Sequence, residues 1–285
     1  SSLSSLWLVS GPTGYRGRRR ISREYSLRIA VDAMGGDNGP GVIVQGVARA
    51  VADFSLEVLL VGQREKIEAS LAKIPVNLDA RSRIKIVEAP EAIGMGEGPF
   101  SFYRKRRSSL QIGAQLVKDG LAQALVSMGN TAAVVYISQK IFCPLYGVDK
   151  PALALLVPTL QGSTLLIDVG ASVNCRPHHL VQFAFMGKIF MESVMGISNP
   201  RVALMSIGEE EVKGNDLTRQ AFERLEQLPI NFIGNVEGRD IYSGKAEVIV
   251  SDGFTGNVAL KVSEGVVETL LFLAKKEITR NFLAK

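Results

Sequence analysis

The sequence lacks the signatures of several large enzyme classes. Its 285 residues contain only two cysteines, Cys143 and Cys175, with neither a CxxC pair nor the Cys/His spacing of a zinc site. It has no GxSxG elbow, no HExxH motif and no GxxxxGKS/T loop. The turn at 35–39 is rich in glycine but does not match GxGxxG, which weakens a dinucleotide-binding interpretation. We therefore predict neither a cofactor nor a bound metal.

Aromatic residues are also scarce, at 7% of the chain, and in the sequence they are not interleaved with the basic ones. Surfaces that bind single-stranded nucleic acid combine both kinds of residue, so we predict no nucleic-acid partner. The formal net charge is nevertheless +5, and basic residues cluster at 16–23 and 104–107. Such a cluster is either a solvated face or a docking surface for an acidic partner.

No apolar stretch is long enough to span a bilayer. Residues 1–26 are rich in Ser and Arg and show no clean periodicity, which is typical of a transit peptide or of another extension outside the fold. Two thiols without a disulfide framework are typical of a reducing compartment. We expect a cytoplasmic protein, or a plastid one if residues 1–26 are a transit peptide.

Apolar, β-branched runs alternate with helical patterns along residues 27–285. Nearly continuous apolar runs indicate strands buried on both faces of a sheet, and strands alternating with helices indicate a mainly parallel sheet. We therefore predict a single α/β domain of three αβα layers over 27–285. Predicted strands are at 28–33, 57–62, 84–88, 124–128, 152–157, 164–169, 201–207, 230–234 and 247–251. Predicted helices are at 41–54, 64–73, 108–118, 131–142, 178–195, 216–227 and from 257 onward.

Glycine-bearing turns follow four of these strands, at 31–37, 127–131, 168–174 and 251–257. In an open α/β sheet such turns gather at the carboxyl edge, where ligands bind. Backbone N–H groups at glycine turns and helix starts are good hosts for phosphate. The candidate phosphate-binding residues are Gly35, Gly36, Ser127, Asn130, Thr131, Asn174, Gly253 and Asn257.

These turns carry polar and acidic residues rather than a nucleophile with its base, which suits a reaction in which phosphate itself attacks a carbonyl. Asp32 and Asp168 end strands at the predicted ligand edge, where a carboxylate can orient a substrate or accept a proton. Lys261, close to the predicted helix start, is positioned to face an anion there. The alternative is that Asn130 only caps a helix and that the aspartates only close turns.

Cys175 has no base that the sequence identifies, so we interpret it as a small buried thiol rather than a nucleophile. His178 and His179 follow Pro177 and fit helix-start residues better than metal ligands.

Two further segments are candidate contact surfaces. The irregular segment 91–107 is a predicted mobile loop that ends in Arg104, Lys105, Arg106 and Arg107. The segment 262–285 is a predicted protruding amphipathic helix, either a core or dimer helix or one that lies at a membrane surface. The candidate membrane residues on it are Leu270, Leu271, Phe272, Ile278 and Phe282.

Several of these segments resemble the bacterial phosphate acyltransferase family of phospholipid synthesis, PlsX. The matching stretches are RIAVDAMGGD at 28–37, SMGNT at 127–131, LIDVGASVNC at 166–175, NPRVALMSIGEEE at 199–211, KGN at 213–215, INFIGNVEGRDIYSGK at 230–245 and DGFTGNVALK at 252–261. The resemblance implies a fold similar to the isocitrate/isopropylmalate dehydrogenase group. It implies transfer of a long fatty acyl group from acyl carrier protein to inorganic phosphate, giving acyl phosphate for a downstream membrane acyltransferase. It also implies a homodimer that associates peripherally with the membrane, and it makes acyl carrier protein the acidic partner of Arg104 to Arg107.

The chain departs from the family pattern at Met128 and Ala132, where smaller residues are usual, at Arg107 and in the loop 94–102. The resemblance also leads us to expect a further C-terminal segment beyond Lys285. These departures keep a second hypothesis open, a non-catalytic relative that only binds membrane or carrier protein. A nicotinamide-dependent decarboxylating dehydrogenase is a third hypothesis, which the missing metal carboxylates disfavour.

Overall fold

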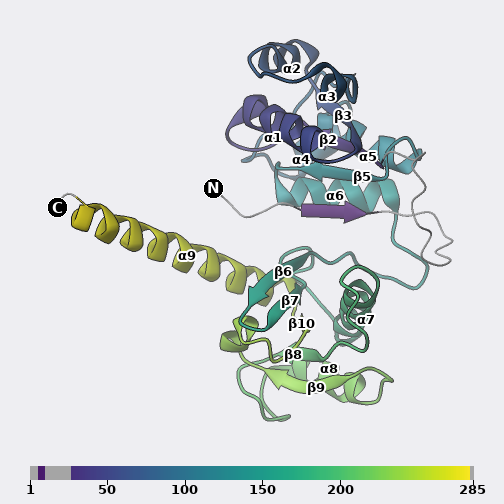
Figure 1. Ribbon diagram of the computed structural model, residues 1–285. Coiled ribbons are helices and arrows are strands. Elements are labelled where there is room, and N and C mark those ends of the chain that lie inside the picture. The colour runs from purple at the N-terminus through teal and green to yellow at the C-terminus, as the bar shows by residue number, and fades with distance from the viewer. Residues whose placement is uncertain (1–5, 10–26, 283–285) are drawn as a thin grey trace. The chain divides into compact units, whose positions relative to one another are not determined.

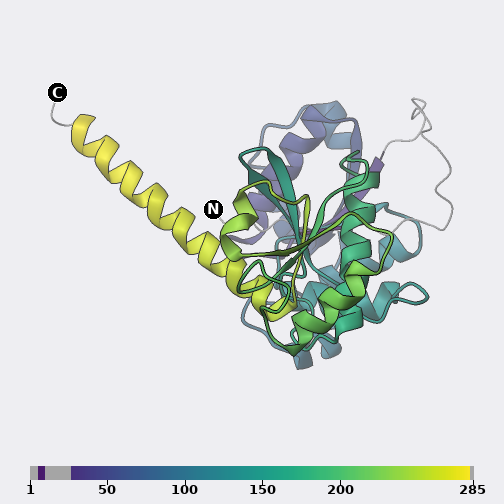
Figure 2. The ribbon, with the colours of Figure 1, turned by 90° about the horizontal axis from the view of Figure 1, so that it is seen from below.

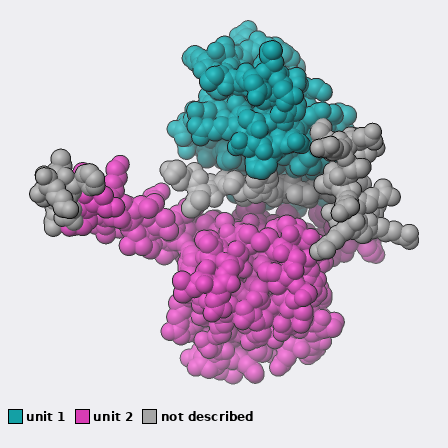
Figure 3. Space-filling view, viewed as in Figure 1, with its two compact units in different colours: residues 1–143 teal, residues 144–285 magenta. Residues whose placement is uncertain are grey.

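The structure is a computed structural model that describes residues 6–9 and 27–282, with side chains for 27–279. The chain divides into two compact units, residues 1–143 and 144–285 (Figure 3), whereas a single domain over 27–285 is predicted from the sequence. Each unit contains its own five-stranded sheet. The predicted α/β class with mainly parallel strands is confirmed in both units (Figure 1).

Unit 1 is a three-layer αβα sandwich. Its sheet has the order β1-β5-β2-β3-β4, and every pairing is parallel except that of β1 with β5. The strands are β1 (Leu6–Val9), β2 (Leu27–Asp32), β3 (Leu56–Gly62), β4 (Ile84–Glu88) and β5 (Ala124–Ser127). The helices are α1 (Gly39–Asp53), α2 (Arg64–Leu71), α3 (Leu78–Ser82), α4 (Pro99–Arg104), α5 (Ser109–Lys118) and α6 (Thr131–Phe142).

Successive residues of a strand point to opposite faces of a sheet, so the strands β2 to β5 supply two cores. Ala30 packs in the core beneath α4, α5 and α6, whereas its neighbour Val31 packs in the core beneath α1, α2 and α3. This two-sided burial explains why the strands are nearly continuous apolar runs.

Residues 1–26 are predicted to lie outside the fold, but Leu6–Val9 forms the antiparallel edge strand β1 on β5. The segment reads LWLV, in which Trp7 and Val9 have high β-propensity. The rest of the predicted extension lies outside the described residues. The loop 91–107 also contains a short helix, α4, that was not predicted.

Unit 2 has a sheet of order β6-β7-β10-β8-β9, in which only the β6–β7 pairing is antiparallel. The strands are β6 (Ala154–Thr159), β7 (Gly162–Ile167), β8 (Val202–Met205), β9 (Phe232–Val236) and β10 (Val248–Val250). The helices are α7 (Pro177–Ser193), α8 (Asp216–Glu226), the 3-10 turn η1 (Gly238–Tyr242) and α9 (Gly253–Phe282). Apolar residues of α7 and α8 form a common core with β7, β8 and β10.

Helix α9 extends away from the rest of unit 2 as one long rod (Figure 2). From Gly265 to Thr279 every side chain position is exposed in the isolated chain. The candidate membrane residues Leu270, Leu271, Phe272 and Ile278 are 59 to 66% exposed, and the side chain of Phe282 lies outside the described residues. Among the described helices none combines the length and the apolar character needed to cross a membrane.

Candidate functional site

Asp32 and Ser127 are neighbours at the carboxyl edge of the unit 1 sheet, because they face each other in the parallel register of β2 and β5. The Ser127 hydroxyl donates to Oδ2 of Asp32 at 2.8 Å, and the two residues are 5% and 4% exposed. Oδ1 of Asp32 accepts the N–H of Met34 at 3.1 Å, and the Ser127 Oγ accepts the N–H of Gly129 at 3.1 Å. The pair therefore fixes the turns that follow both strands.

Glycine is required where these two turns meet. A Cβ on Gly35 would lie 2.7 Å from the Gly129 nitrogen and 2.9 Å from Oδ2 of Asp32, closer than side-chain atoms approach such groups. Gly36 has a φ of +86°, a left-handed conformation that glycine adopts without strain. Both predicted glycines thus belong to the close approach of the two turns.

Helix α6 begins directly after the second turn, with Asn130 as its N-cap. Oδ1 of Asn130 accepts the N–H of Ala133 at 3.0 Å, and its Nδ2 donates to the carbonyls of Met95 and Glu97 at 2.6 and 3.2 Å. The Asn130 side chain is therefore fully used in capping the helix and holding the loop 91–98. The backbone N–H groups at the start of α6 are the donors that this arrangement leaves for a ligand.

The N–H groups of Thr131 and Ala132 have no partner within the described part of the chain. In the first turn, the N–H groups of Gly35 and Gly36 are likewise without a partner among the described residues. Free N–H groups at a helix start attract anions, since the helix dipole adds a partial positive charge there. This edge of unit 1 has the chemistry of an oxyanion or phosphate cradle.

Asp168 is the corresponding acid of unit 2, and it is completely buried. Its Oδ1 accepts the N–H groups of Leu153, Gly170 and Ala171 at 2.9, 3.0 and 2.9 Å, and its Oδ2 accepts that of Ser172 at 2.7 Å. These bonds shape the loop after β7 and anchor it to the residue before β6. The carboxylate proposed as catalytic thus has the contacts of a turn-closing residue, the alternative considered from the sequence.

The loop after β7 packs against the start of α9. Asp252 caps this helix, accepting the N–H groups of Phe254 and Thr255 at 3.0 and 3.1 Å. The N–H of Gly253 donates to the carbonyl of Ser172 at 2.9 Å. Asn257 donates from Nδ2 to the carbonyl of Val169 at 3.3 Å. These donors are therefore occupied within unit 2, unlike those of unit 1.

Lys261 is not directed at the start of α9. The helix begins at Gly253, earlier than the predicted start at 257, so Lys261 lies beyond its first turn. Its Nζ pairs with Glu264 at 2.7 Å, and its side chain is 65% exposed. The lysine that reaches the loop after β7 is Lys150, whose Nζ donates to the carbonyl of Asn174 at 2.6 Å. No motif in the sequence identified Lys150.

Cys175 closes the same loop, with its thiol donating to the carbonyl of Ser172 at 3.1 Å. Burial raises the pKa of this thiol, although the N–H of Gly253 acts in the opposite direction. A thiol with a raised pKa is protonated at neutral pH and is a poor nucleophile. This agrees with the structural role inferred from the sequence.

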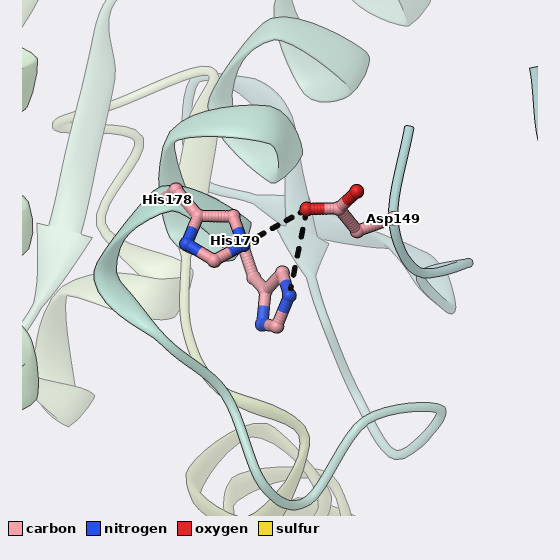
Figure 4. Close-up of side chains that lie close together, drawn as sticks. All are labelled: Asp149, His178 and His179. Atoms are coloured by element: carbon pink, nitrogen blue, oxygen red, sulfur yellow. Dashed lines mark ion pairs between the residues drawn. The ribbon is translucent and has the colours of Figure 1, made fainter. Parts of the chain in front are cut away.

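Asp149, His178 and His179 form a cluster of potential metal ligands at the start of α7 (Figure 4). Nε2 of His178 lies 2.9 Å from Oδ2 of Asp149, and Nε2 of His179 lies 3.9 Å from it. However, Nδ1 of His179 accepts the N–H of Arg176 at 2.9 Å, so a neutral ring carries its proton on Nε2. Burial lowers the pKa of His179 and favours this neutral form. Because metal-bound histidines donate from their second nitrogen, the cluster fits a helix-start hydrogen-bond network better than a metal centre.

Among the predicted docking residues, Lys105 already uses its ammonium group in contacts within unit 1. Its Nζ pairs with Oε1 of Glu97 at 2.5 Å and donates to the carbonyl of Ala92 at 2.7 Å. The hydrogen bond from Lys105 lowers the pKa of Glu97 and keeps it ionised. Arg104, Arg106 and Arg107 are exposed, so the available part of the predicted surface is smaller than the sequence indicates.

Comparison with known proteins decides the family. A family model described as "Fatty acid synthesis protein" matches residues 27–285. A phosphate acyltransferase of Heliobacterium modesticaldum is 49% identical over 260 residues, covering 91% of this chain and 77% of that relative. The chain belongs to the phosphate acyltransferase family. A second member, from Citrifermentans bemidjiense, is 46% identical over 261 residues, covering 91% of this chain and 73% of that relative.

Solved structures agree on the fold. The EutD phosphotransacetylase from Staphylococcus aureus has a TM-score of 0.59 at 16% identity, covering 85% of this chain and 83% of that one. A branched-chain phosphotransacylase from Enterococcus faecalis V583 has a TM-score of 0.56 at 16% identity, covering 82% and 83%. The family predicted from the motifs is confirmed. The chain is therefore an acyltransferase, as its family members are.

Proposed function

We propose that the chain transfers a long-chain fatty acyl group from acyl carrier protein to inorganic phosphate, which gives acyl phosphate for phospholipid synthesis. The observation that carries this proposal is the set of N–H groups at 35–36 and 131–132 that have no partner among the described residues, next to the buried Asp32–Ser127 pair. Phosphate acyltransferase relatives at 46 to 49% identity support the reaction class. We assign the phosphate cradle to this edge of unit 1.

Bound phosphate would supply the nucleophile itself. A phosphate oxygen forms a bond to the thioester carbonyl carbon, and the resulting tetrahedral oxyanion collapses as the carbon–sulfur bond breaks. The proton of hydrogen phosphate passes to the leaving thiolate, so acyl phosphate and the free carrier thiol are formed. Such a reaction needs oriented N–H donors rather than a side-chain nucleophile, which agrees with the protonated state of Cys175.

The deciding experiment incubates the purified chain with palmitoyl-acyl carrier protein, with and without phosphate, and follows the free carrier thiol. Hydroxylamine trapping of acyl phosphate identifies the product. We expect thiol release that depends on phosphate and is matched by trapped product. Release that is independent of phosphate would contradict the proposal, and carrier binding without release would support the alternative of a non-catalytic relative.

Replacement of Thr131 by proline tests the cradle directly. Thr131 is the first residue of α6, where proline keeps the helix but removes the N–H donor, and the preceding Asn130 has the extended backbone that proline needs. We expect the KM for phosphate to rise by about 10-fold, the effect of losing one hydrogen bond to a charged group.

Two variants serve as controls for this change. Thr131→Ala retains the N–H, and its KM for phosphate should stay within about 2-fold of the original. Leu78→Pro places proline at the first residue of α3, where the side chain is 90% exposed, and should leave the KM unchanged. An unchanged KM for phosphate in Thr131→Pro would show that the N–H of Thr131 does not bind phosphate.

We further propose that α9 makes the contacts between two copies of the chain or with the membrane surface. The exposed apolar residues Leu270, Leu271, Phe272 and Leu273 are consecutive, so they surround the helix rather than form one stripe. A helix that is apolar on several sides requires a covering partner or an apolar phase. We also propose that a downstream membrane acyltransferase uses the acyl phosphate that the chain produces.

A further inference from the structure

Helix α4, the turn that follows it and helix α6 present a surface of unit 1 that combines cations and aromatic rings. We call it the α4–α6 surface and define it by Phe100, Tyr103, Arg104, Arg106 and Lys140. The rings are unusually accessible for aromatic residues, with Phe100 at 74% and Tyr103 at 50% exposure. Exposed aromatic side chains beside arginines are typical of the energetic centres of protein interfaces.

The rings hold the cations in place. The guanidinium of Arg104 lies 5.4 Å from the centroid of Phe100, and that of Arg106 lies 5.4 Å from the centroid of Tyr103. The ammonium of Lys140 lies 4.6 Å from the same Tyr103 ring, so this tyrosine stands between cations from two elements. Cation–π contact limits the rotamers of long side chains and thereby lowers the entropy lost on binding.

These cations are also uncompensated. Within residues 27–279, Arg104, Arg106 and Lys140 form no ion pair, whereas Lys105 in the same run is paired with Glu97. Arg106 and Lys140 face the same Tyr103 ring without an ion-paired acid among the described residues, so these two positive charges repel each other. An acidic partner would relieve this repulsion, and it would be attracted over a distance of about 10 Å at moderate salt.

We infer that the α4–α6 surface docks an acidic protein that presents a cluster of carboxylates. This inference rests on the proposed function, in which the acyl donor is carried by such a protein. Guanidinium groups fixed over rings are suited to bidentate pairing with carboxylates, whereas a lipid surface requires only a diffuse positive charge. Compared with the predicted basic run, the surface gains Phe100, Tyr103 and Lys140, and it retains Arg104 and Arg106 but neither Lys105 nor Arg107.

The test measures binding of fluorescently labelled holo-acyl carrier protein, without turnover. Arg106→Glu/Lys140→Glu should weaken the Kd by at least about 10-fold and flatten its dependence on salt. The matched control, Lys66→Glu/Lys73→Glu, makes the same change in charge at two exposed lysines of unit 1 outside this surface and should change the Kd less than about 2-fold. Equal weakening in both double variants would overturn the inference, because only net charge would then matter.

Two further measurements separate the other outcomes. Loss of binding to phosphatidylglycerol vesicles, with carrier-protein binding intact, would overturn the inference in favour of a lipid surface. If the original chain binds carrier protein through this surface but never releases thiol in the presence of phosphate, the docking inference stands and the proposed reaction fails. Conversely, phosphate-dependent release that is equally fast in Arg106→Glu/Lys140→Glu would retain the reaction and reject the docking surface.

Discussion

Asp168→Ala is expected to reduce activity by about 100-fold or more and to lower the free energy of unfolding by about 3–5 kcal/mol. The substitution removes the acceptor of four backbone N–H groups, those of Leu153, Gly170, Ala171 and Ser172, in a completely buried position. The hydrogen bonds to Leu153 and Ser172 are buried, so the loss of the carboxylate leaves these two donors without a partner away from water. Chemical denaturation followed by circular dichroism, together with the phosphate-dependent thiol assay, measures both effects.

Asp168→Asn separates a role in the turn from a role in proton transfer. An amide keeps the acceptor oxygen for three of the N–H groups but places its NH2 against the N–H of Ser172. If Asp168 shapes the loop, the loss of activity in this variant follows its loss of stability. Full stability with no activity would instead support the catalytic role of Asp168.

Asp149→Ala is the control at an exposed acid, whose side chain is 54% exposed. This variant should lower the free energy of unfolding by less than about 1 kcal/mol.

Gly256→Ala is expected to destabilise the protein by about 3 kcal/mol or more. A Cβ at this position would lie 1.9 Å from the carbonyl oxygen of Asp168 and 2.6 Å from Oγ of Ser251. The first of these atoms is backbone, and the second already donates to the same carbonyl at 2.8 Å. The start of α9 would therefore have to separate from the loop after β7. Thermal denaturation measures the loss.

Gly265→Ala is the matched control in the same helix. A Cβ there meets no atom of the described residues within 4 Å, and the position is exposed. Since alanine has the higher helix propensity, this variant should gain about 0.5–1 kcal/mol. Equal stability of the two variants would show that α9 does not approach the loop after β7 as closely as described.

The candidate sites illustrate how far local sequence patterns extend. Asn130 before Thr131 is a helix start signal, and Asn130 does cap α6. The same pattern does not reveal that the Asn130 amide also holds the carbonyls of Met95 and Glu97, because that contact joins residues far apart in the chain. Lys105 and Arg106 are adjacent and chemically alike, yet one is bound to Glu97 and the other is exposed.

Sequence alone determined the alternation of strands and helices, the glycine turns that end the strands, and the family. Each of these features depends on short stretches of residues that are neighbours in the chain. Tertiary structure decided the two units, the edge strand β1, and the groups that remain available for a ligand. Asp32 ends β2 and Asp168 directly follows β7. Asp32 lies beside N–H groups that have no partner in the described part of the chain, whereas the Asp168 carboxylate accepts hydrogen bonds from four N–H groups. The difference arises because hydrogen bonds between distant segments depend on how strands and loops pack, and no local pattern encodes which partner a buried carboxylate meets.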